Sequence, residues 1–182
     1  MNIYETGFDG LKIIKPAIYK DLRGYFFESF NLSVLEKNGL SFNPVQDNES
    51  RSSKGVIRGL HYQLNPFAQA KLIRVIEGKI LDVVLDLRKE SSTFGKWFSL
   101  ELDSVNKDQL LIPKGFAHGF SVLSGIAVIQ YKCDNVYNQL YERGISVNDP
   151  YLKIDWKTAD DEMLISDKDK GHPGFKDAEN NF

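Results

Sequence analysis

The sequence has only one cysteine, Cys133, among its 182 residues. A single thiol cannot form an intrachain disulfide or a cluster of thiolate ligands, so a disulfide scaffold and a cysteine metal centre are excluded, and a reducing compartment is favoured. The N-terminus has neither a basic segment nor an apolar run, and no stretch approaches the ~20 consecutive apolar residues that a membrane span requires. We therefore expect a soluble, cytoplasmic protein with no membrane partner.

An excess of positive charge is also missing, because 23 Lys and Arg residues stand against 25 Asp and Glu residues. A surface for nucleic-acid phosphates needs clustered Lys and Arg, so nucleic acid is not an expected partner. A small anionic ligand is still compatible with this balance if cations converge locally. Aromatic residues make up 12% of the chain, which favours β structure or a site that stacks a ring.

Short apolar segments separated by turn residues recur through most of the chain. They predict strands at residues 11–14, 25–30, 56–63, 71–76, 80–87, 97–102, 109–112, 120–123 and 126–133. One short helix is expected at residues 34–37, ended by Asn38 and Gly39. Because no long helical period intervenes, we expect a mainly β protein: a single jelly-roll (cupin-like) β-sandwich domain over residues 1–182, with short peripheral helices. From about residue 171 we expect an exposed, loosely ordered tail.

One predicted strand, residues 56–63, departs from the pattern of a core strand. It begins with the β-branched Val56 and Ile57 but continues with Arg58, Gly59 and His61. Because histidine titrates near neutral pH, a strand that carries His beside Arg can both move a proton and hold an anion. The alternative is a core histidine bonded to a backbone carbonyl.

A second unusual stretch, residues 113–120, contains Pro113, Gly115 and His118 and resembles a signature of the cupin superfamily of jelly rolls. Metal-binding cupins present a His-x-His pair and a nearby carboxylate at the first signature, where this chain has His61 followed by Tyr and Gln. Only His61 and His118 are left as ligands, which is too few for a closed site. We therefore expect no metal, and a metal-dependent oxygenase is disfavoured.

The remaining polar groups suit proton transfer next to an anion. His61 is a candidate base, and Lys71 is a cation that could stabilise an oxyanion. Spacing alone leaves open which carboxylate orients the base and which tyrosine donates a proton, the candidates being Asp82, Asp169, another Asp, Tyr131 and Tyr137. It also leaves open which cations neutralise phosphates, the candidates being Arg23, Arg51, Arg58 and Lys168.

Several stretches, in chain order, closely resemble the dTDP-4-dehydrorhamnose 3,5-epimerase family. They lie at residues 23–28, 45–50, 56–63, 71–75, 112–120, 131–137 and 164–169, so the resemblance covers nearly the whole chain. The family is a cofactor-independent homodimeric jelly roll that converts dTDP-4-dehydro-6-deoxy-D-glucose to dTDP-4-dehydro-L-rhamnose. The resemblance implies an epimerase that needs no cofactor and acts on a dTDP-linked 4-keto-6-deoxy sugar. It also implies a homodimer whose active sites are completed across the interface.

The family pattern also implies residue roles. Inverting C3 and C5 beside a C4 ketone requires proton removal, an enolate and proton return on the opposite face, so one base is not enough. The resemblance makes His61 the base and Asp169 its orienting partner. It makes Tyr131 the acid and places Lys71 near the C4 oxygen. Its substrate-binding positions are Arg23, Phe26, Glu28, Gln46, Asn48, Arg58, His118, Tyr137, Glu142 and Lys168. Among these, Tyr137 would stack on thymine, and Arg23, Phe26 and Glu28 would reach the site from the partner subunit.

Two alternatives stay open at this stage. One is an epimerase that inverts C3 only or acts on another nucleotide-linked 4-keto sugar, because the number of inverted centres depends on how the sugar ring flips. The other is a non-catalytic sugar-nucleotide binding protein. Such a protein would tolerate the loss of His61, Tyr131 or Asp169, and all three are present.

Overall fold

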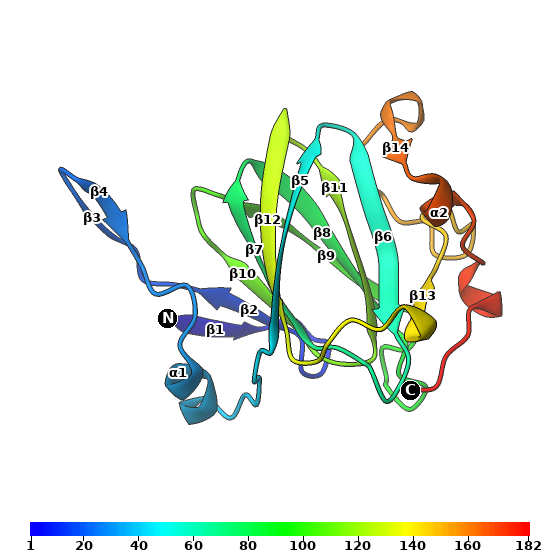
Figure 1. Ribbon diagram of the computed structural model, residues 1–182, viewed down its shortest axis with the longest axis horizontal. Helices are drawn as coiled ribbons and strands as arrows, with labels where there is room; N and C mark the ends of the chain where they lie inside the picture. Colours follow the sequence, from blue (N-terminus) through cyan, green and yellow to red (C-terminus); the bar gives the residue numbers. More distant parts are fainter.

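Two six-stranded sheets face each other in the computed structural model, which describes residues 1–182 (Figure 1). The first sheet has the order β1-β2-β10-β7-β12-β5, and all its pairs are antiparallel. Its strands are β1 (Asn2–Glu5), β2 (Lys12–Lys15), β5 (Gln46–Ser53), β7 (Lys71–Glu77), β10 (Gln109–Ile112) and β12 (Ile126–Cys133).

The second sheet has the order β13-β6-β11-β8-β9. Its strands are β6 (Val56–Gln63), β8 (Lys79–Asp86), β9 (Trp97–Asp103), β11 (Phe116–Val122) and β13 (Glu142–Gly144). A short parallel strand, β14 (Leu164–Ile165), pairs with the start of β6, whereas β13 pairs with its end. The predicted jelly-roll sandwich is confirmed.

The inner faces of the two sheets bury a common apolar core. Ile73 of β7 and Val84 of β8 belong to one cluster of 13 buried residues. Strand β8 is buried on both faces, because Val83 on its outer face packs in a second cluster that contains Trp156. Removing apolar surface from water contributes roughly 25 cal/mol per Å². A strand covered on both sides therefore explains the nearly continuous apolar run at residues 80–87.

Strand β5 was not predicted, because its first six residues, QDNESR, are all polar. It lies at the edge of the first sheet, where its side chains alternate between half-buried and exposed positions up to Arg51. Polar residues suit such an edge, since one face and one side of the strand meet water. The apolar pattern used to recognise strands is therefore absent here.

The last residues of the chain differ from the expected exposed, loosely ordered tail. The Tyr62 hydroxyl donates to the carbonyl of Glu179, and the Asn65 and Asn181 amides exchange hydrogen bonds. Phe182 packs against the Tyr62 ring at a centroid distance of 6.3 Å. These hydrogen bonds and the ring contact hold the last residues of the chain against the end of β6 and the residues that follow it. Whether the chain folds as one domain stays a prediction.

A two-stranded hairpin, β3 (Tyr19–Asp21) with β4 (Gly24–Phe26), projects from the sandwich at the end opposite α2 (Asp167–Lys170) (Figure 1). We call it the arm. Strand β4 is shorter than the predicted strand at residues 25–30. All residues of the arm strands are exposed, including Tyr19 and Phe26. Apolar side chains that project together into solvent are characteristic of an interaction surface.

The helices are short and peripheral, as predicted. Helix α1 (Leu32–Lys37) begins after Asn31, whose side chain accepts a hydrogen bond from Val34 N, and ends at Asn38. The others are α2 and the 3₁₀ turns η1 (Gln139–Tyr141), η2 (Asp160–Glu162) and η3 (Phe175–Asp177). None has the length and apolar character that a bilayer-spanning helix requires.

Candidate active site

The backbone around His61 is shaped by Gly59. Gly59 has a φ of +124°, and a Cβ at this position would lie 2.5 Å from the Cα of Gly119 in the neighbouring strand β11. Only glycine permits this approach. The pairing of β6 with β11 shifts register at the same place, between His118 and Phe120. The glycine that interrupts the predicted strand is therefore explained by a local irregularity next to the candidate base.

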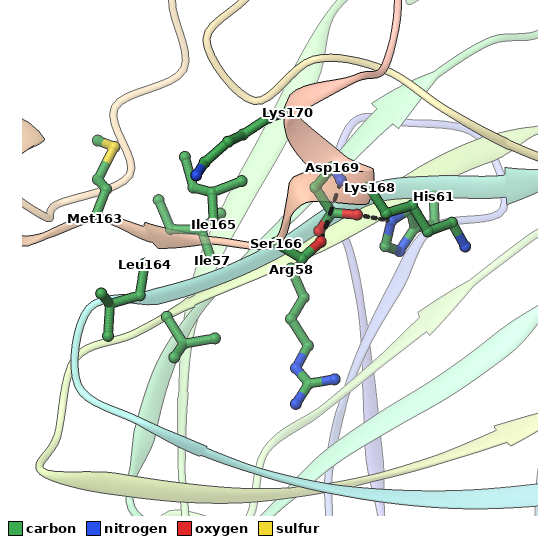
Figure 2. Close-up of a pocket in the computed structure, with 11 residues that line it drawn as sticks. Ile57, Arg58, His61, Met163, Leu164, Ile165, Ser166, Lys168, Asp169 and Lys170 are labelled. Carbon is green, nitrogen blue, oxygen red and sulfur yellow. Dashed lines mark hydrogen bonds and ion pairs between the residues drawn. The ribbon is translucent and has the colours of Figure 1, made fainter.

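His61 and Asp169 form a hydrogen-bonded pair, with Nε2 of His61 2.8 Å from Oδ1 of Asp169 (Figure 2). The Gly59 N–H donates to the other carboxylate oxygen at 3.3 Å. Burial raises the pKa of the Asp169 carboxyl, but the hydrogen bond and charge of His61 and the Gly59 N–H lower it, and the net pKa lies below its usual range. Asp169 is therefore ionised and can hold the His61 ring in one orientation.

Helix α2 fixes the position of Asp169. Its N-cap is Ser166, whose Oγ accepts a hydrogen bond from the Asp169 N–H at 3.1 Å (Figure 2). Strand β14 joins this helix to β6 through the pair Ile165 and Ile57. The stretch at residues 164–169 is thus a strand and a capped helical turn that deliver a buried carboxylate to the second sheet.

His61 faces a cavity of about 320 Å³ between the two sheets. The first sheet contributes Tyr131 from β12 and Lys71 from β7, whereas His61 comes from β6 of the second sheet. The full lining is Gln46, Asn48, His61, Tyr62, Gln63, Gln69, Lys71, Tyr131, Tyr137 and Glu142. The cavity therefore brings together three of the four predicted catalytic residues and four of the predicted substrate-binding residues.

Burial changes the acid–base properties of the two groups contributed by the first sheet. It raises the pKa of the Tyr131 hydroxyl, so Tyr131 stays protonated and able to donate a proton near neutral pH. It lowers the pKa of the Lys71 ammonium. A histidine held by a carboxylate thus shares one cavity with a protonated phenol and an amine, which is the inventory that proton transfer through an enolate requires.

Glu142 organises the mouth of this cavity. Its Oε2 accepts hydrogen bonds from the Tyr137 hydroxyl at 2.8 Å and from Lys168 Nζ at 2.7 Å. Burial raises the pKa of Glu142, but these two partners lower it, and the net pKa is below its usual range. An ionised Glu142 therefore fixes an aromatic ring and a cation beside each other.

A second cavity, of about 620 Å³, lies beside the His61–Asp169 pair (Figure 2). Arg58, Lys168 and Lys170 line it together with apolar residues of β6 and β14. Arg58 points away from the pair, and its Nε donates to Ser52 Oγ at 3.1 Å. Three cationic side chains around one opening suit a ligand that carries phosphates.

His118 lies beside His61 on the neighbouring strand and lines neither cavity. The two histidines are directly paired between β11 and β6, but the His118 ring is hydrogen-bonded to Asp82, with Nε2 2.8 Å from Oδ1. Asp82 is fully buried and its second carboxylate oxygen has no partner. Of the carboxylates that spacing left open, Asp82 therefore belongs to His118 and Asp169 to His61. A sugar contact by His118 stays a prediction.

Three predicted binding residues do not join the site within one chain. Arg23 in the arm turn is 91% exposed and forms an ion pair with Asp21. Phe26 is exposed on β4, and Glu28 accepts a hydrogen bond from the Asn31 amide at 3.0 Å. The arm lies on the far side of the molecule from α2 (Figure 1).

Sequence reasoning missed His172. Its Nε2 lies 3.6 Å from Oδ1 of Asp169, and its ring meets the His61 ring edge to face. The expectation of no metal considered only His61 and His118, whereas His61, Asp169 and His172 together are a group of potential metal ligands. The spacing of three between Asp169 and His172 is visible in the sequence, but α2 ends at Lys170, so helical periodicity does not pair the two residues.

Comparison with known proteins adds to this geometry. The family model described as dTDP-4-dehydrorhamnose 3,5-epimerase matches residues 5–177. A protein of that name from Shigella flexneri is 48% identical over 180 residues, 98% of each chain. A crystal structure of the Elizabethkingia anophelis NUHP1 enzyme of that name superimposes with a TM-score of 0.94, at 48% identity over 100% of this chain and 99% of the other. The 3,5-epimerase of Legionella pneumophila Philadelphia 1, solved in complex with dTDP-4-keto-L-rhamnose, gives a TM-score of 0.91 at 46% identity, covering 96% and 93%.

Proposed function

Because this chain belongs to the dTDP-4-dehydrorhamnose 3,5-epimerase family, we propose that its reaction takes place in the cavity between His61 and Tyr131. The protein is an epimerase that inverts C3 and C5 of dTDP-4-dehydro-6-deoxy-D-glucose and yields dTDP-4-dehydro-L-rhamnose. The assignment of residues rests on one observation: a histidine held by a buried carboxylate and a protonated tyrosine line the same cavity from opposite sheets.

Each inversion needs a base on one face of the sugar and an acid on the other. His61 removes the hydrogen next to the C4 ketone as a proton, and the resulting imidazolium is stabilised by Asp169. The electron pair of the broken C–H bond moves into the enolate, whose oxygen is stabilised by the Lys71 ammonium. Tyr131 then protonates the carbon from the opposite face. Exchange with water restores both groups before the second inversion.

The nucleotide is held at the cavity mouth. Tyr137 lies there with its hydroxyl anchored on Glu142, so its ring is presented to a flat base such as thymine. Lys168, anchored on the same carboxylate, and Arg58 supply positive charge to the diphosphate. Gln46 and Asn48 of β5 offer amide groups to the sugar or base.

The arm completes the active site of a second copy in a homodimer. Its exposed Leu22, Tyr25 and Phe26 present an apolar surface, and Arg23 at its turn adds a cation. The hairpin β3–β4 projects away from the sandwich (Figure 1), and none of its residues lines the cavity, so these groups reach a nucleotide if the arm extends into a partner. Glu28, which follows the arm in the chain, would reach the partner's nucleotide together with Arg23 and Phe26.

The test is to incubate the protein with dTDP-4-dehydro-6-deoxy-D-glucose in deuterated water and to follow C3 and C5 by NMR. We expect deuterium at both carbons and a product with inverted C3 and C5. His61→Asn should abolish the exchange and leave dTDP binding nearly unchanged, whereas exchange at the wild-type rate would remove His61 from the mechanism. Label at C3 alone would correct the reaction to a single inversion, and no label would contradict it.

A further inference from the structure

His172 brings a third potential ligand to the His61–Asp169 pair. Its Nε2 is buried, has no hydrogen-bond partner and lies 3.6 Å from Oδ1 of Asp169. The rings of His61 and His172 meet at a centroid distance of 5.5 Å and an interplanar angle of 80°. No step of the proposed reaction uses His172. A buried ring nitrogen that has no hydrogen-bond partner and lies 3.6 Å from a buried carboxylate calls for a physical explanation.

The backbone next to His61 leaves space for this ring. Gly144 of β13 pairs directly with His61, and a Cβ at Gly144 would lie 2.3 Å from Nε2 of His172. The imidazole therefore occupies the volume that any other residue at position 144 would fill. The position of His172 is consequently set by packing as well as by its place after α2.

We propose that His61, Asp169 and His172 form a binding site for a zinc ion. Two imidazole nitrogens and a carboxylate oxygen are donors that Zn²⁺ prefers, and three protein ligands leave one position open. The three potential ligand atoms lie within 4.8 Å of one another, and the two separations that involve Asp169 Oδ1 are 2.8 and 3.6 Å. Tetrahedral zinc with bonds of about 2.0–2.1 Å holds its ligand atoms about 3.4 Å apart. The His172–Asp169 separation of 3.6 Å is close to this value, and the His61–Asp169 separation of 2.8 Å would have to widen as zinc replaces their hydrogen bond.

The proposed zinc site is accessible from solvent. The His61 side chain is 28% exposed and borders both cavities, so an ion can enter beside it without unfolding the site. A water molecule would then complete the coordination. The positive charges of Arg58 and Lys168, which line the larger cavity, repel a zinc ion, whereas the negative charge of Asp169 attracts it.

Zinc at this site would block the base. The Asp169 carboxylate only accepts hydrogen bonds, so in the free enzyme the ring proton of His61 is on Nε2 and the lone pair is on Nδ1. When Nε2 binds zinc, the ring proton moves to Nδ1, and no lone pair is left to accept a proton from the substrate. Zinc therefore inhibits. This consequence rests on the proposed role of His61, whereas zinc binding itself does not.

Isothermal titration of the metal-free protein with ZnCl₂ tests the site. We expect one zinc per chain for the wild type. His172→Phe keeps a ring without nitrogen ligands and should weaken binding more than about 100-fold, since even groups that only support a ligand are worth 10–100-fold in metal affinity. The control is Asp167→Asn, an exposed carboxylate on the same helix, which should bind as the wild type does. Unchanged binding by His172→Phe, or no stoichiometric binding by the wild type, would overturn the proposal.

Nitrogen-15 NMR of the imidazole rings needs no variant. The chain has three histidines, and zinc should shift the nitrogens of His61 and His172 and leave those of His118 in place. A zinc-dependent shift confined to His118, or none at any ring, would also overturn the site. In an activity assay, zinc should inhibit reversibly, with activity restored by EDTA. If zinc binds as expected but exchange at C3 and C5 continues, the zinc site stands and the role of His61 as base fails.

Discussion

His61 and Asp169 are 108 positions apart in the sequence, and yet Nε2 of the one lies 2.8 Å from Oδ1 of the other. The Asp169 side chain is only 5% exposed. Its second carboxylate oxygen accepts a hydrogen bond from the Gly59 N–H. Because both carboxylate oxygens have donors, the His61 ring is held in one orientation with its second nitrogen free. The two residues therefore act as one unit, and we expect a change in either of them to reduce catalysis.

Asp169→Asn should lower kcat by roughly 10²–10⁴-fold, because the amide keeps the shape of the carboxylate but loses the charge that stabilises the imidazolium. Binding of dTDP should change little, since Asp169 is buried behind His61. Rates of deuterium exchange and isothermal titration with dTDP measure the two effects. Asp167→Asn, on the exposed side of α2, is the control. If both variants lose activity equally, the helix and not the carboxylate is responsible.

Tyr131→Phe should separate proton loss from inversion. The base on the other side of the cavity is intact, so α-hydrogens of the substrate should still exchange with solvent, while proton return to the opposite face is impaired. NMR in deuterated water should show labelled substrate with its original configuration. Product formation at the wild-type rate would mean that another group is the acid.

Lys71 should set the alkaline limit of the reaction. Burial lowers the pKa of its ammonium below the ordinary 10.5, so Lys71 loses its proton at a lower pH than an exposed lysine does. We therefore expect kcat to fall at a pH below the pKa of an ordinary lysine, 10.5. Lys71→Met should lower kcat about 10²–10³-fold at neutral pH. A pH profile of kcat tests this, and a limb near or above 10.5 would contradict it.

Asp86 should stabilise the fold in a pH-dependent manner. Burial raises its pKa, but hydrogen bonds from Arg88, Ser91 and Thr93 lower it to about 2. Because the folded pKa lies below the unfolded value of about 3.9, the contribution is present above pH 4 and is lost as the pH falls toward 2. Asp86→Asn should therefore reduce the free energy of unfolding by about 2 kcal/mol at pH 7.

Urea unfolding of the Asp86 variant at pH 7 and pH 3 measures this difference, which should shrink at the lower pH. Glu101 provides the control. Its pKa is also lowered to about 2 by Lys157 and Lys79, but it lies on the surface, where such pairs contribute less than about 1 kcal/mol. Glu101→Gln should therefore have the smaller effect, and equal effects would refute the argument from burial.

The arm should control both assembly and nucleotide affinity. Phe26→Asp introduces a charge on its exposed apolar surface and should shift a dimer toward monomer in analytical ultracentrifugation. Arg23→Ala should leave assembly nearly intact but weaken dTDP binding. If Phe26→Asp remains dimeric with unchanged affinity, the arm does not lie in the interface.

Much of the fold could be predicted because its strands carry a local pattern. The run at residues 71–76 alternates partially, the run at 126–133 is largely apolar between turn residues, and 80–87 is apolar because β8 is covered on both faces. Strand β5 escaped prediction because an edge strand does not need apolar residues. The terminal segment escaped because isolated residues such as Phe182 have no periodicity to reveal what they pack against.

For the site, residue type and spacing identified His61, Lys71 and Tyr131 as candidates but could not pair them with partners. Sequence spacing does not distinguish Asp82 from Asp169, and only the folded structure shows that Asp82 bonds to His118 and Asp169 to His61. Such contacts join residues far apart in the chain, and no local rule specifies them. Resemblance to a family supplied the choice of Asp169, but it left His172 without a role.

The parallel pairing of β14 with β6 also determines when activity can appear during refolding. Leu164 pairs with Val56 across most of the chain, so this contact closes a very long loop. Closing long loops carries an entropic cost that is offset only after the intervening strands have packed. Asp169 reaches His61 only once this contact has formed. Recovery of catalysis after dilution from denaturant should therefore follow the slowest structural phase, which makes turnover a late marker of the native state.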